Sequence, residues 1–246
     1  MVGRSIYKAI KKKNLFNIVE CNRKNLDFTN QKAVDTWFKK NKPEIVINAA
    51  GRVGGILDNY TYQPDYLYIN TMIGLNLINS SLKYNVKKLI NLGSACIYPK
   101  NVKQPIKEDA LLSSQLEKSN EGYAIAKIVC LKYCQYLKQK LKKDFISIQP
   151  ANLYGKGDNF DLKSSHVLPA LVKKFTIAKN KKLNSVEIWG SGIAKREFLN
   201  VDDLSNAILF LLKNKIKEDY INIGSGEQFS IKKLALMIKK LLDIKE

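Results

Sequence analysis

The sequence predicts an α/β protein with a doubly wound parallel sheet, because apolar strands alternate with amphipathic helices along the chain. Two predicted strands, at residues 43–50 and 88–92, are short and mostly apolar, which is typical of strands buried on both faces of a parallel sheet. Several strands run into Gly and Ser residues, at the edge where open α/β sheets bind ligands. These observations favour a Rossmann-type domain.

Composition limits the classes of function. The 246 residues suffice for one α/β domain with a small appended lobe, and no apolar run reaches transmembrane length. The net charge of +20 comes almost wholly from Lys, since Arg occurs only four times, and the abundant Lys, Asn and Ile are residues of AT-rich codons. We therefore predict no nucleic-acid and no membrane partner, although the positive field would favour a phosphate-bearing ligand.

The cysteines and the chain start indicate the compartment. The four Cys have no metal-ligand spacing and the chain has one His, so no metal site is predicted. Cys130 and Cys134 are expected to be buried thiols. The first residues lack the pattern of a secretory leader, which predicts a cytoplasmic protein.

The first half of the chain is expected to form helices at residues 1–11 and 29–41, strands at 16–21, 43–50 and 88–92, a glycine cluster at 51–55, and a helix ending near 85. A Rossmann domain begins with a strand and a Gly-rich turn, and Gly3 matches only the last glycine of that turn. The first strand is therefore missing. Arg23 follows the strand at 16–21, where NADP-preferring folds meet the 2′-phosphate, although a solvated loop arginine fits nearly as well.

In the second half we expect strands with turns at residues 145–155, 186–192 and 220–226, a helix through residue 178 that begins near His166, and a strand from residue 196 running into a helix at 201–213. A last helix begins at Ser230. We divide the chain into an NADP-binding domain at 1–155 and a mainly substrate-binding region at 156–246, which is interleaved with the first.

Four side chains suggest carbonyl chemistry. Ser94 and Cys96 follow the strand at 88–92, so they are expected at the ligand-binding edge. Tyr123 and Lys127 are spaced i, i+4 on a helix, which places the phenol and the ammonium on one face. A neighbouring cation favours the phenolate and lowers the pKa of the phenol. With the Ser94 hydroxyl, the pair could hold a carbonyl oxygen and exchange a proton with it during hydride transfer.

This combination resembles the short-chain dehydrogenase/reductase superfamily, and seven stretches narrow the resemblance to the GDP-L-fucose synthases. They are residues 49–56 (AAGRVGGI), 92–99 (LGSACIYP), 120–127 (NEGYAIAK), 150–155 (PANLYG), 165–171 (SHVLPAL), 189–192 (WGSG) and 196–203 (REFLNVDD). The resemblance implies an NADPH-dependent enzyme, usually dimeric, that epimerises GDP-4-keto-6-deoxy-D-mannose at C3 and C5 and then reduces C4.

The resemblance implies a role for each catalytic residue. Cys96 and His166 would be the base and the acid of epimerisation, Tyr123 would protonate the C4 oxygen, and Lys127 and Ser94 would assist it. The cofactor would contact Gly3, Arg23, Leu92, Gly93, Ser94, Ala95, Lys127, Pro150, Ala151, Asn152, Leu153 and His166. The GDP part of the substrate would contact Lys174, Trp189 and Arg196. Lys174 is commonly Arg in the family, and Trp189 could instead be a core residue.

Both ends of the chain look cut when compared with the family. Loss of the first strand would remove the pyrophosphate cradle, so we expect an active full-length protein and a 246-residue chain that binds NADPH poorly. Other interpretations remain open. The chain could be another extended reductase, such as a 4-epimerase or 4,6-dehydratase that needs no Cys96 and His166 pair, or a non-catalytic fragment that keeps the fold.

Overall fold

A computed structural model describes residues 1–244, and its centre is a parallel sheet. The strands are β1 (Ile45–Asn48), β2 (Lys88–Leu92), β3 (Asp144–Pro150) and β6 (Tyr220–Ile223), in the order β1-β2-β3-β6. Every neighbouring pair in this sheet is parallel. The predicted α/β fold class is therefore confirmed.

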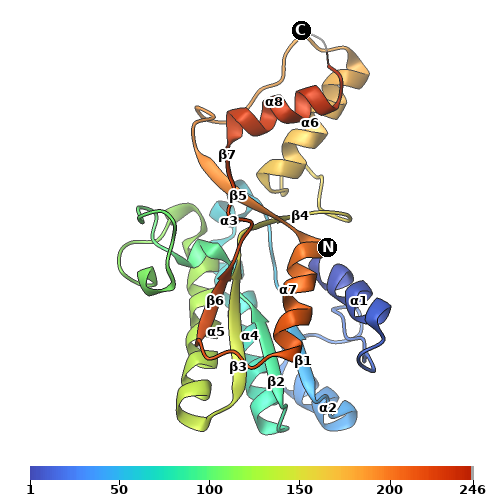
Figure 1. Ribbon diagram of the computed structural model, residues 1–246, viewed down its shortest axis with the longest axis vertical. Helices are drawn as coiled ribbons and strands as arrows, with labels where there is room; N and C mark the ends of the chain where they lie inside the picture. The colour runs from blue at the N-terminus through green and yellow to red at the C-terminus, as the bar shows by residue number, and fades with distance from the viewer. Residues whose placement is uncertain (245–246) are drawn as a thin grey trace.

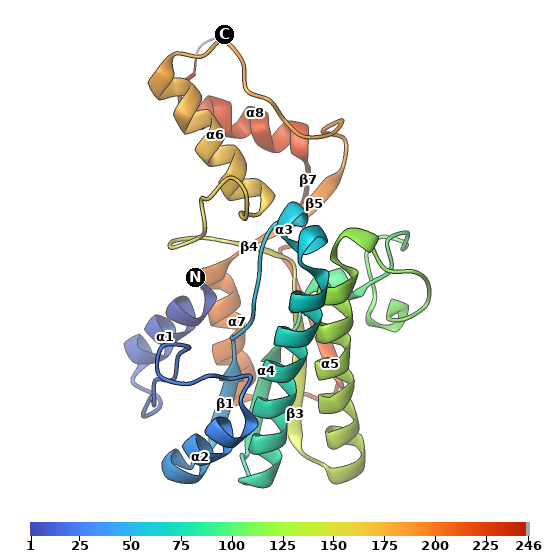
Figure 2. The same cartoon turned by 180° about the vertical axis from the view of Figure 1, so that it is seen from behind.

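Helices cover both faces of this sheet (Figures 1 and 2). On one face lie α1 (Val2–Lys13) and α7 (Val201–Lys213), and on the other α2 (Gln31–Asn41), α4 (Gln63–Lys83) and α5 (Glu121–Leu141). The short helix α3 (Ile56–Thr61) precedes α4. Single 3₁₀ turns occupy Ala95–Ile97, Glu108–Ala110 and Lys118–Asn120.

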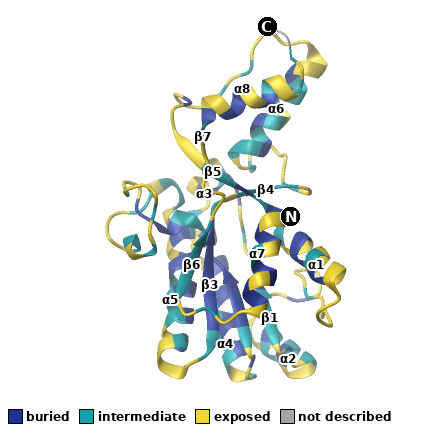
Figure 3. Cartoon of the chain, viewed as in Figure 1, coloured by how far each residue is buried: buried dark blue, intermediate teal, exposed yellow. Residues whose placement is uncertain are grey.

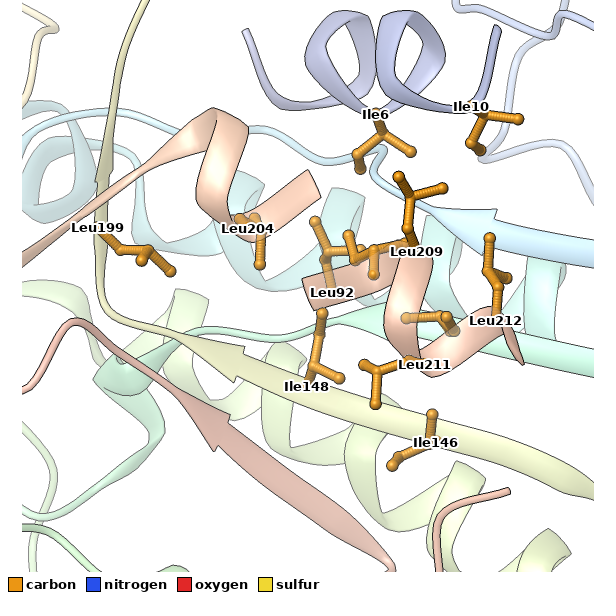
Figure 4. Packing of buried hydrophobic residues seen from close by; sticks show 12 residues of the cluster. Ile6, Ile10, Leu92, Ile146, Ile148, Leu199, Leu204, Leu209, Leu211 and Leu212 are labelled. Carbon is orange, nitrogen blue, oxygen red and sulfur yellow. The ribbon is translucent and has the colours of Figure 1, made fainter. Parts of the chain in front are cut away.

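The strands alternate between two hydrophobic cores, as the two-residue period of a strand requires. Leu89 and Phe145 pack towards α2, α4 and α5, whereas Ile90, Leu92 and Ile148 pack towards α1 and α7. Figure 4 shows the second core, and Figure 3 shows that the central strands β2 and β3 are deeply buried, whereas β6 at the edge is only partly buried. Burial on both faces explains why these strands contain so few charged residues.

A smaller lobe rises from the carboxyl edge of the sheet (Figure 1). It contains a second sheet of β4 (Asn152–Tyr154), β5 (Lys195–Asn200) and β7 (Gln228–Ser230), with α6 (Val167–Lys181) and α8 (Ile231–Leu241) packed together. The strand β7 is antiparallel to β5 and was not predicted. The predicted substrate-binding region at 156–246 includes this lobe except β4, together with α7 and β6 of the main sheet layer and two residues, 245–246, that lie outside the described part of the chain.

Two predicted strands are wrong. Residues 16–21 form no strand, and residues 16–20 are exposed. A strand needs a neighbouring strand to pair with, and among residues 1–244 no strand lies on the outer edge of β1 to which residues 16–21 could pair. Residues 186–192 also lack a strand. There, Val186 and Ile188 pack against the core of the small lobe, so their apolar alternation reflects burial without strand pairing.

Candidate active site

Ser94 and Cys96 lie directly after β2, at the carboxyl edge of the sheet. The turn that presents them is fixed by a hydrogen bond of 2.8 Å from the Gly93 amide to the carbonyl oxygen of Ile148 on β3. The Ser94 hydroxyl accepts a hydrogen bond from the Cys96 amide, at 3.3 Å, and thereby caps the 3₁₀ turn that follows. The hydroxyl and the thiol are therefore held by one short turn.

Tyr123 and Lys127 reach the same edge from the first turns of α5. The Lys127 ammonium is buried and donates a hydrogen bond of 2.8 Å to the carbonyl oxygen of Leu92, at the end of β2. The same nitrogen lies 5.5 Å from the centre of the Tyr123 ring. The structure therefore brings together the two helix residues and the strand end, as the spacing of these residues in the sequence predicted.

The protonation of Tyr123 differs from the sequence prediction. Burial raises the pKa of the phenol above its ordinary value, with the nearby Cys96 and Tyr66 adding to the increase and the Ser94 hydroxyl opposing it. Desolvation lowers the pKa of Lys127, whose ammonium is held by Leu92. The expected lowering of the Tyr123 pKa by Lys127 is therefore not seen. The phenol is neutral near pH 7, which is the form that can donate a proton.

The two residues predicted for epimerisation also have shifted pKa values. Burial raises the pKa of the Cys96 thiol to about 11, while Ser94 and Lys127 act in the opposite direction. The His166 side chain is exposed, but neighbouring protein removes part of its hydration, which lowers its pKa below the usual 6.5, against the effect of Asp158. Near pH 7 the pair therefore consists of a thiol and a neutral imidazole.

His166 is the N-cap residue of α6, in the small lobe. The segment before it is tied to the glycine cluster, since the Gly55 amide donates a hydrogen bond of 2.8 Å to the carbonyl oxygen of Ser164. A Cβ atom on Gly55 would collide with the Ser165 carbonyl, so only glycine permits this approach. The glycine cluster thus connects the His166 segment to the Rossmann domain.

A polar cluster beside Tyr123 was missed by the sequence analysis. The ring of Tyr66 meets that of Tyr123 edge to face, with centroids 6.0 Å apart, and its hydroxyl donates to the Asp58 carboxylate. The Arg52 guanidinium covers the Tyr66 ring at 4.9 Å and lies 3.3 Å from Asp65. The only sequence signal was the number of Tyr and Asp residues after the glycine cluster, which does not reveal which of them pair.

The predicted cofactor residues lie at the carboxyl ends of the strands. A Cβ atom on Gly3, in the first turn of α1, would lie 3.8 Å from the Cβ of Ala49, just beyond β1. Leu92, Gly93 and Ala95 surround the end of β2, and the residues from Pro150 to Leu153 surround the end of β3. The first turn of α1 lies beside the end of β1, and a helix N-terminus at strand ends suits a dinucleotide pyrophosphate, so these residues fit the predicted cofactor. Arg23 is exposed in a turn, and its phosphate contact stays a prediction.

The three predicted substrate residues lie in the small lobe. The Lys174 ammonium lies 5.1 Å above the Trp189 ring and donates a hydrogen bond of 3.0 Å to the carbonyl oxygen of Glu187. Trp189 is 63% exposed, which rules out the alternative of a core residue. Arg196 lies on β5 and donates to the carbonyl oxygen of the adjacent Lys195. The structure brings Lys174 and Trp189 into contact and leaves Arg196 outside that contact.

Within residues 1–244, no group of three or more His, Cys, Asp and Glu side chains could hold a metal ion. None of the helices in the same range is long and apolar enough to cross a membrane.

Comparison with known proteins defines the class. Residues 1–224 match the model of the NAD dependent epimerase/dehydratase family. Because this match covers most of the chain, and because the fold and the edge residues agree with it, the chain belongs to that family.

Within the family, named relatives narrow the group. A GDP-L-fucose synthase from Sinorhizobium fredii is 45% identical, covering 100% of this chain and 78% of the relative, and GDP-L-fucose synthase 1 from Arabidopsis thaliana is 45% identical, covering 98% and 75%. A solved GDP-L-fucose synthetase from Naegleria fowleri with NADP bound is 28% identical with a TM-score of 0.88, covering 99% and 75%. The predicted resemblance to GDP-L-fucose synthases is confirmed.

Proposed function

We propose that this chain is an NADPH-dependent GDP-L-fucose synthase that converts GDP-4-keto-6-deoxy-D-mannose to GDP-L-fucose. The observation that carries the proposal is the meeting of Ser94, Cys96, Tyr123 and Lys127 at one sheet edge. The names of the relatives support GDP-L-fucose as the product, and the NADP bound in the Naegleria fowleri structure supports the same cofactor pair. A 4-epimerase or 4,6-dehydratase would leave the Cys96 and His166 pair without a use, and no observation favours one.

Epimerisation needs two groups that exchange protons with the sugar. The C4 ketone acidifies the protons at C3 and C5, so one group removes a proton and another returns one to the opposite face. Cys96 and His166 carry these roles. Near pH 7 Cys96 is a thiol and His166 is a neutral imidazole. Transfer of the thiol proton to the imidazole would give a thiolate, which can act as the predicted base, and an imidazolium, which can act as the predicted acid.

Reduction uses the residues of α5 and the β2 turn. NADPH supplies the hydride that reaches C4. Tyr123 donates its proton to the C4 oxygen, which it can do because burial keeps the phenol neutral. Lys127, held by Leu92, supplies positive charge beside the phenol and N–H donors for the hydroxyl groups of the cofactor ribose. Ser94 donates a hydrogen bond to the sugar oxygen. Lys174, Trp189 and Arg196 hold the GDP part of the substrate.

The proposal includes a homodimer in the cytoplasm. The helices α4 and α5 pack side by side on the outside of the Rossmann domain, and they carry exposed apolar side chains such as Tyr68, Ile125 and Tyr136. An apolar surface of this kind supports pairing with a second copy. All four cysteines are free thiols, which suits a reducing compartment.

The test incubates the protein with GDP-4-keto-6-deoxy-D-mannose and with enough NADPH to offset the weak cofactor binding expected of this chain, and it follows NADPH absorbance and the sugar product. We expect oxidation of NADPH and formation of GDP-L-fucose, and we expect the Cys96→Ser variant to lose that product. A folded, NADPH-binding protein that oxidises no NADPH with this substrate would contradict the proposal. A reduced product that is inverted at neither C3 nor C5 would contradict the epimerase part of the proposal and support only the reduction at C4.

A further inference from the structure

Four buried polar side chains cross the centre of the main sheet, on strands where apolar residues are the rule. Asn48, Asn91 and Ser147 occupy matching positions on β1, β2 and β3, and Gln149 follows Ser147 on the same face of β3. Their exposed fractions are 4%, 1%, 0% and 1%. We call these four residues the polar ladder. Burying so many polar groups is costly unless each is hydrogen-bonded.

The polar ladder is hydrogen-bonded from one end to the other. Asn48 donates to the Asn91 side-chain oxygen at 2.9 Å, and Asn91 donates to the Ser147 hydroxyl at 3.0 Å. The Gln149 amide nitrogen donates to the same hydroxyl at 3.1 Å. At one end, the Asn48 oxygen accepts from the Ala50 amide at 3.1 Å. At the other end, the Gln149 oxygen accepts from the Ser94 amide at 2.9 Å.

The Ser94 end of the ladder holds the catalytic turn. A Cβ atom on Gly93 would collide with the Gln149 amide, so the glycine lets the backbone settle directly against this side chain. Because the Ser94 hydroxyl in turn caps the Cys96 amide, the position of the Ser94 backbone also determines the position of the thiol. The Ala50 end leads into Gly51, where a Cβ atom would lie 3.8 Å from the Lys127 ammonium.

We propose that Gln149 is a positioning residue for Ser94 and Cys96, and that the polar ladder fixes its amide in the required orientation. The side chain needs an acceptor facing Ser94 and a donor facing Ser147, and an amide provides both. Asn91 and Gln149 both donate to the Ser147 hydroxyl oxygen, so the amide nitrogen of Gln149 must face Ser147 and its oxygen must face Ser94. This inference rests on the proposed function, because the turn it positions is the one that acts on the keto sugar.

The test compares Gln149→Met with Asn76→Leu as a matched control. Asn76 is equally buried and donates to the carbonyl oxygens of Phe28 and Thr29, away from the site, so its loss also removes buried hydrogen bonds. In Gln149→Met we expect kcat for NADPH oxidation with GDP-4-keto-6-deoxy-D-mannose to fall about 10- to 100-fold, because small misplacement of reacting groups has effects of this size. We expect the KM for NADPH to stay within about twofold. The control should lose thermal stability but keep kcat.

Gln149→Glu separates positioning from simple loss of packing. A protonated glutamic acid can accept from Ser94 and donate to Ser147, whereas the carboxylate has no donor. Burial raises the pKa of such a carboxyl above its usual value of about 4.3. The activity of Gln149→Glu relative to the native protein should therefore fall as pH rises from about 6 to about 8. A constant ratio across this range, or a Gln149→Met protein with kcat within about twofold of native, would overturn the proposal.

A second readout keeps this proposal distinct from the proposed function. The rate at which iodoacetamide alkylates Cys96, measured on the Cys96 peptide by mass spectrometry, needs no substrate. We expect it to rise by about threefold or more in Gln149→Met, because a loosened turn hydrates the thiol and favours its thiolate. If the native protein oxidised no NADPH with the sugar and this rate still rose, the proposed substrate would fail and the positioning role would stand. An unchanged alkylation rate would overturn that role.

Discussion

The proposed role of Cys96 in epimerisation makes the protonation of its thiol the property that sets the pH dependence of that step. Its thiol is desolvated beside the strand end, and this burial outweighs the favourable effects of Ser94 and Lys127 on the thiolate. His166, whose pKa is lowered, is the proposed proton acceptor. On this proposal, the thiolate forms by proton transfer to the imidazole or by loss of the proton to solvent at high pH.

The pH dependence of Cys96 alkylation follows from its raised pKa of about 11. Below that pKa the thiolate fraction grows about tenfold per pH unit, so the alkylation rate should still be rising at pH values above about 8.5, where an ordinary thiol begins to level off. The measurement is the iodoacetamide rate on the Cys96 peptide between about pH 7 and pH 10. If the alkylation rate reached a plateau just above pH ~8.5, as for an ordinary thiol with a pKa of about 8.5, the thiol would not be desolvated.

The sequence predicted which side chains gather at the candidate site, but not the residues that contact them there. Ser94, Tyr123 and Lys127 were found because strand ends and i, i+4 spacing are local patterns. The hydrogen bond between Tyr66 and Asp58 and the contact of Gln149 with the Ser94 amide depend on tertiary packing. The raised pKa of Tyr123 was missed for the same reason, since burial is not readable from spacing.

The close packing of α4 against α5 sets the position of the Tyr123 helix. Gly74 on α4 faces Cys130 on α5, and a Cβ atom at Gly74 would collide with the Cys130 sulfur. Cys130 is 2% exposed, so the sulfur cannot move into solvent. The helices α4 and α5 can approach this closely because Gly74 has a hydrogen atom where any other residue has a Cβ atom.

Gly74→Ala should destabilise the protein by about 1–2 kcal/mol, because so close an overlap belongs at the upper end of the roughly 1–3 kcal/mol cost of overpacking a core, and a gain of about 1 kcal/mol in helix propensity offsets part of it. The free energy of unfolding in urea measures the effect. The double variant Gly74→Ala with Cys130→Ala removes the obstructing sulfur and should recover part of the loss. A single variant as stable as the native protein would mean that the two helices can separate without cost.

At the element scale, prediction succeeded where burial and periodicity agree. The strands β2 and β3 and the helix α5 were predicted because their apolar runs are buried on both faces or along one stripe. Residues 16–21 and 186–192 have similar apolar alternation, but neither finds a neighbouring strand in the described part of the chain. The strand β7 has only three residues and pairs with a strand distant in sequence, so no local pattern revealed it.

The whole molecule carries a net charge of +20, and its substrate and cofactor both carry phosphates. Lys174, near Trp189 in the small lobe, and Lys127, near the strand ends, are two cations already at the predicted binding positions. Clustered positive charge raises the local concentration of anionic ligands and does so less in salt. We therefore expect the excess of Lys, which we attributed to codon composition, to strengthen binding of the phosphate-bearing substrate and cofactor as well.

Raising the ionic strength from about 0.01 M to about 1 M should raise the KM for the GDP sugar several-fold, since the Debye length falls from about 30 Å to about 3 Å. We expect kcat to change little, because the proton transfers occur at a buried strand end. Steady-state kinetics in sodium chloride measures both constants. A KM independent of salt would show that the surface charge does not assist binding.

We propose that one site carries out two reactions that mutations can separate: epimerisation by Cys96 and His166, and reduction by Tyr123. The most direct test places Tyr123→Phe in deuterium oxide with GDP-4-keto-6-deoxy-D-mannose and follows deuterium incorporation at C3 and C5 by NMR, with NADPH oxidation measured in parallel. We predict that the variant keeps deuterium exchange and loses NADPH oxidation, and that Cys96→Ser loses the exchange. Loss of both activities in Tyr123→Phe, in a protein that remains folded, would contradict the account.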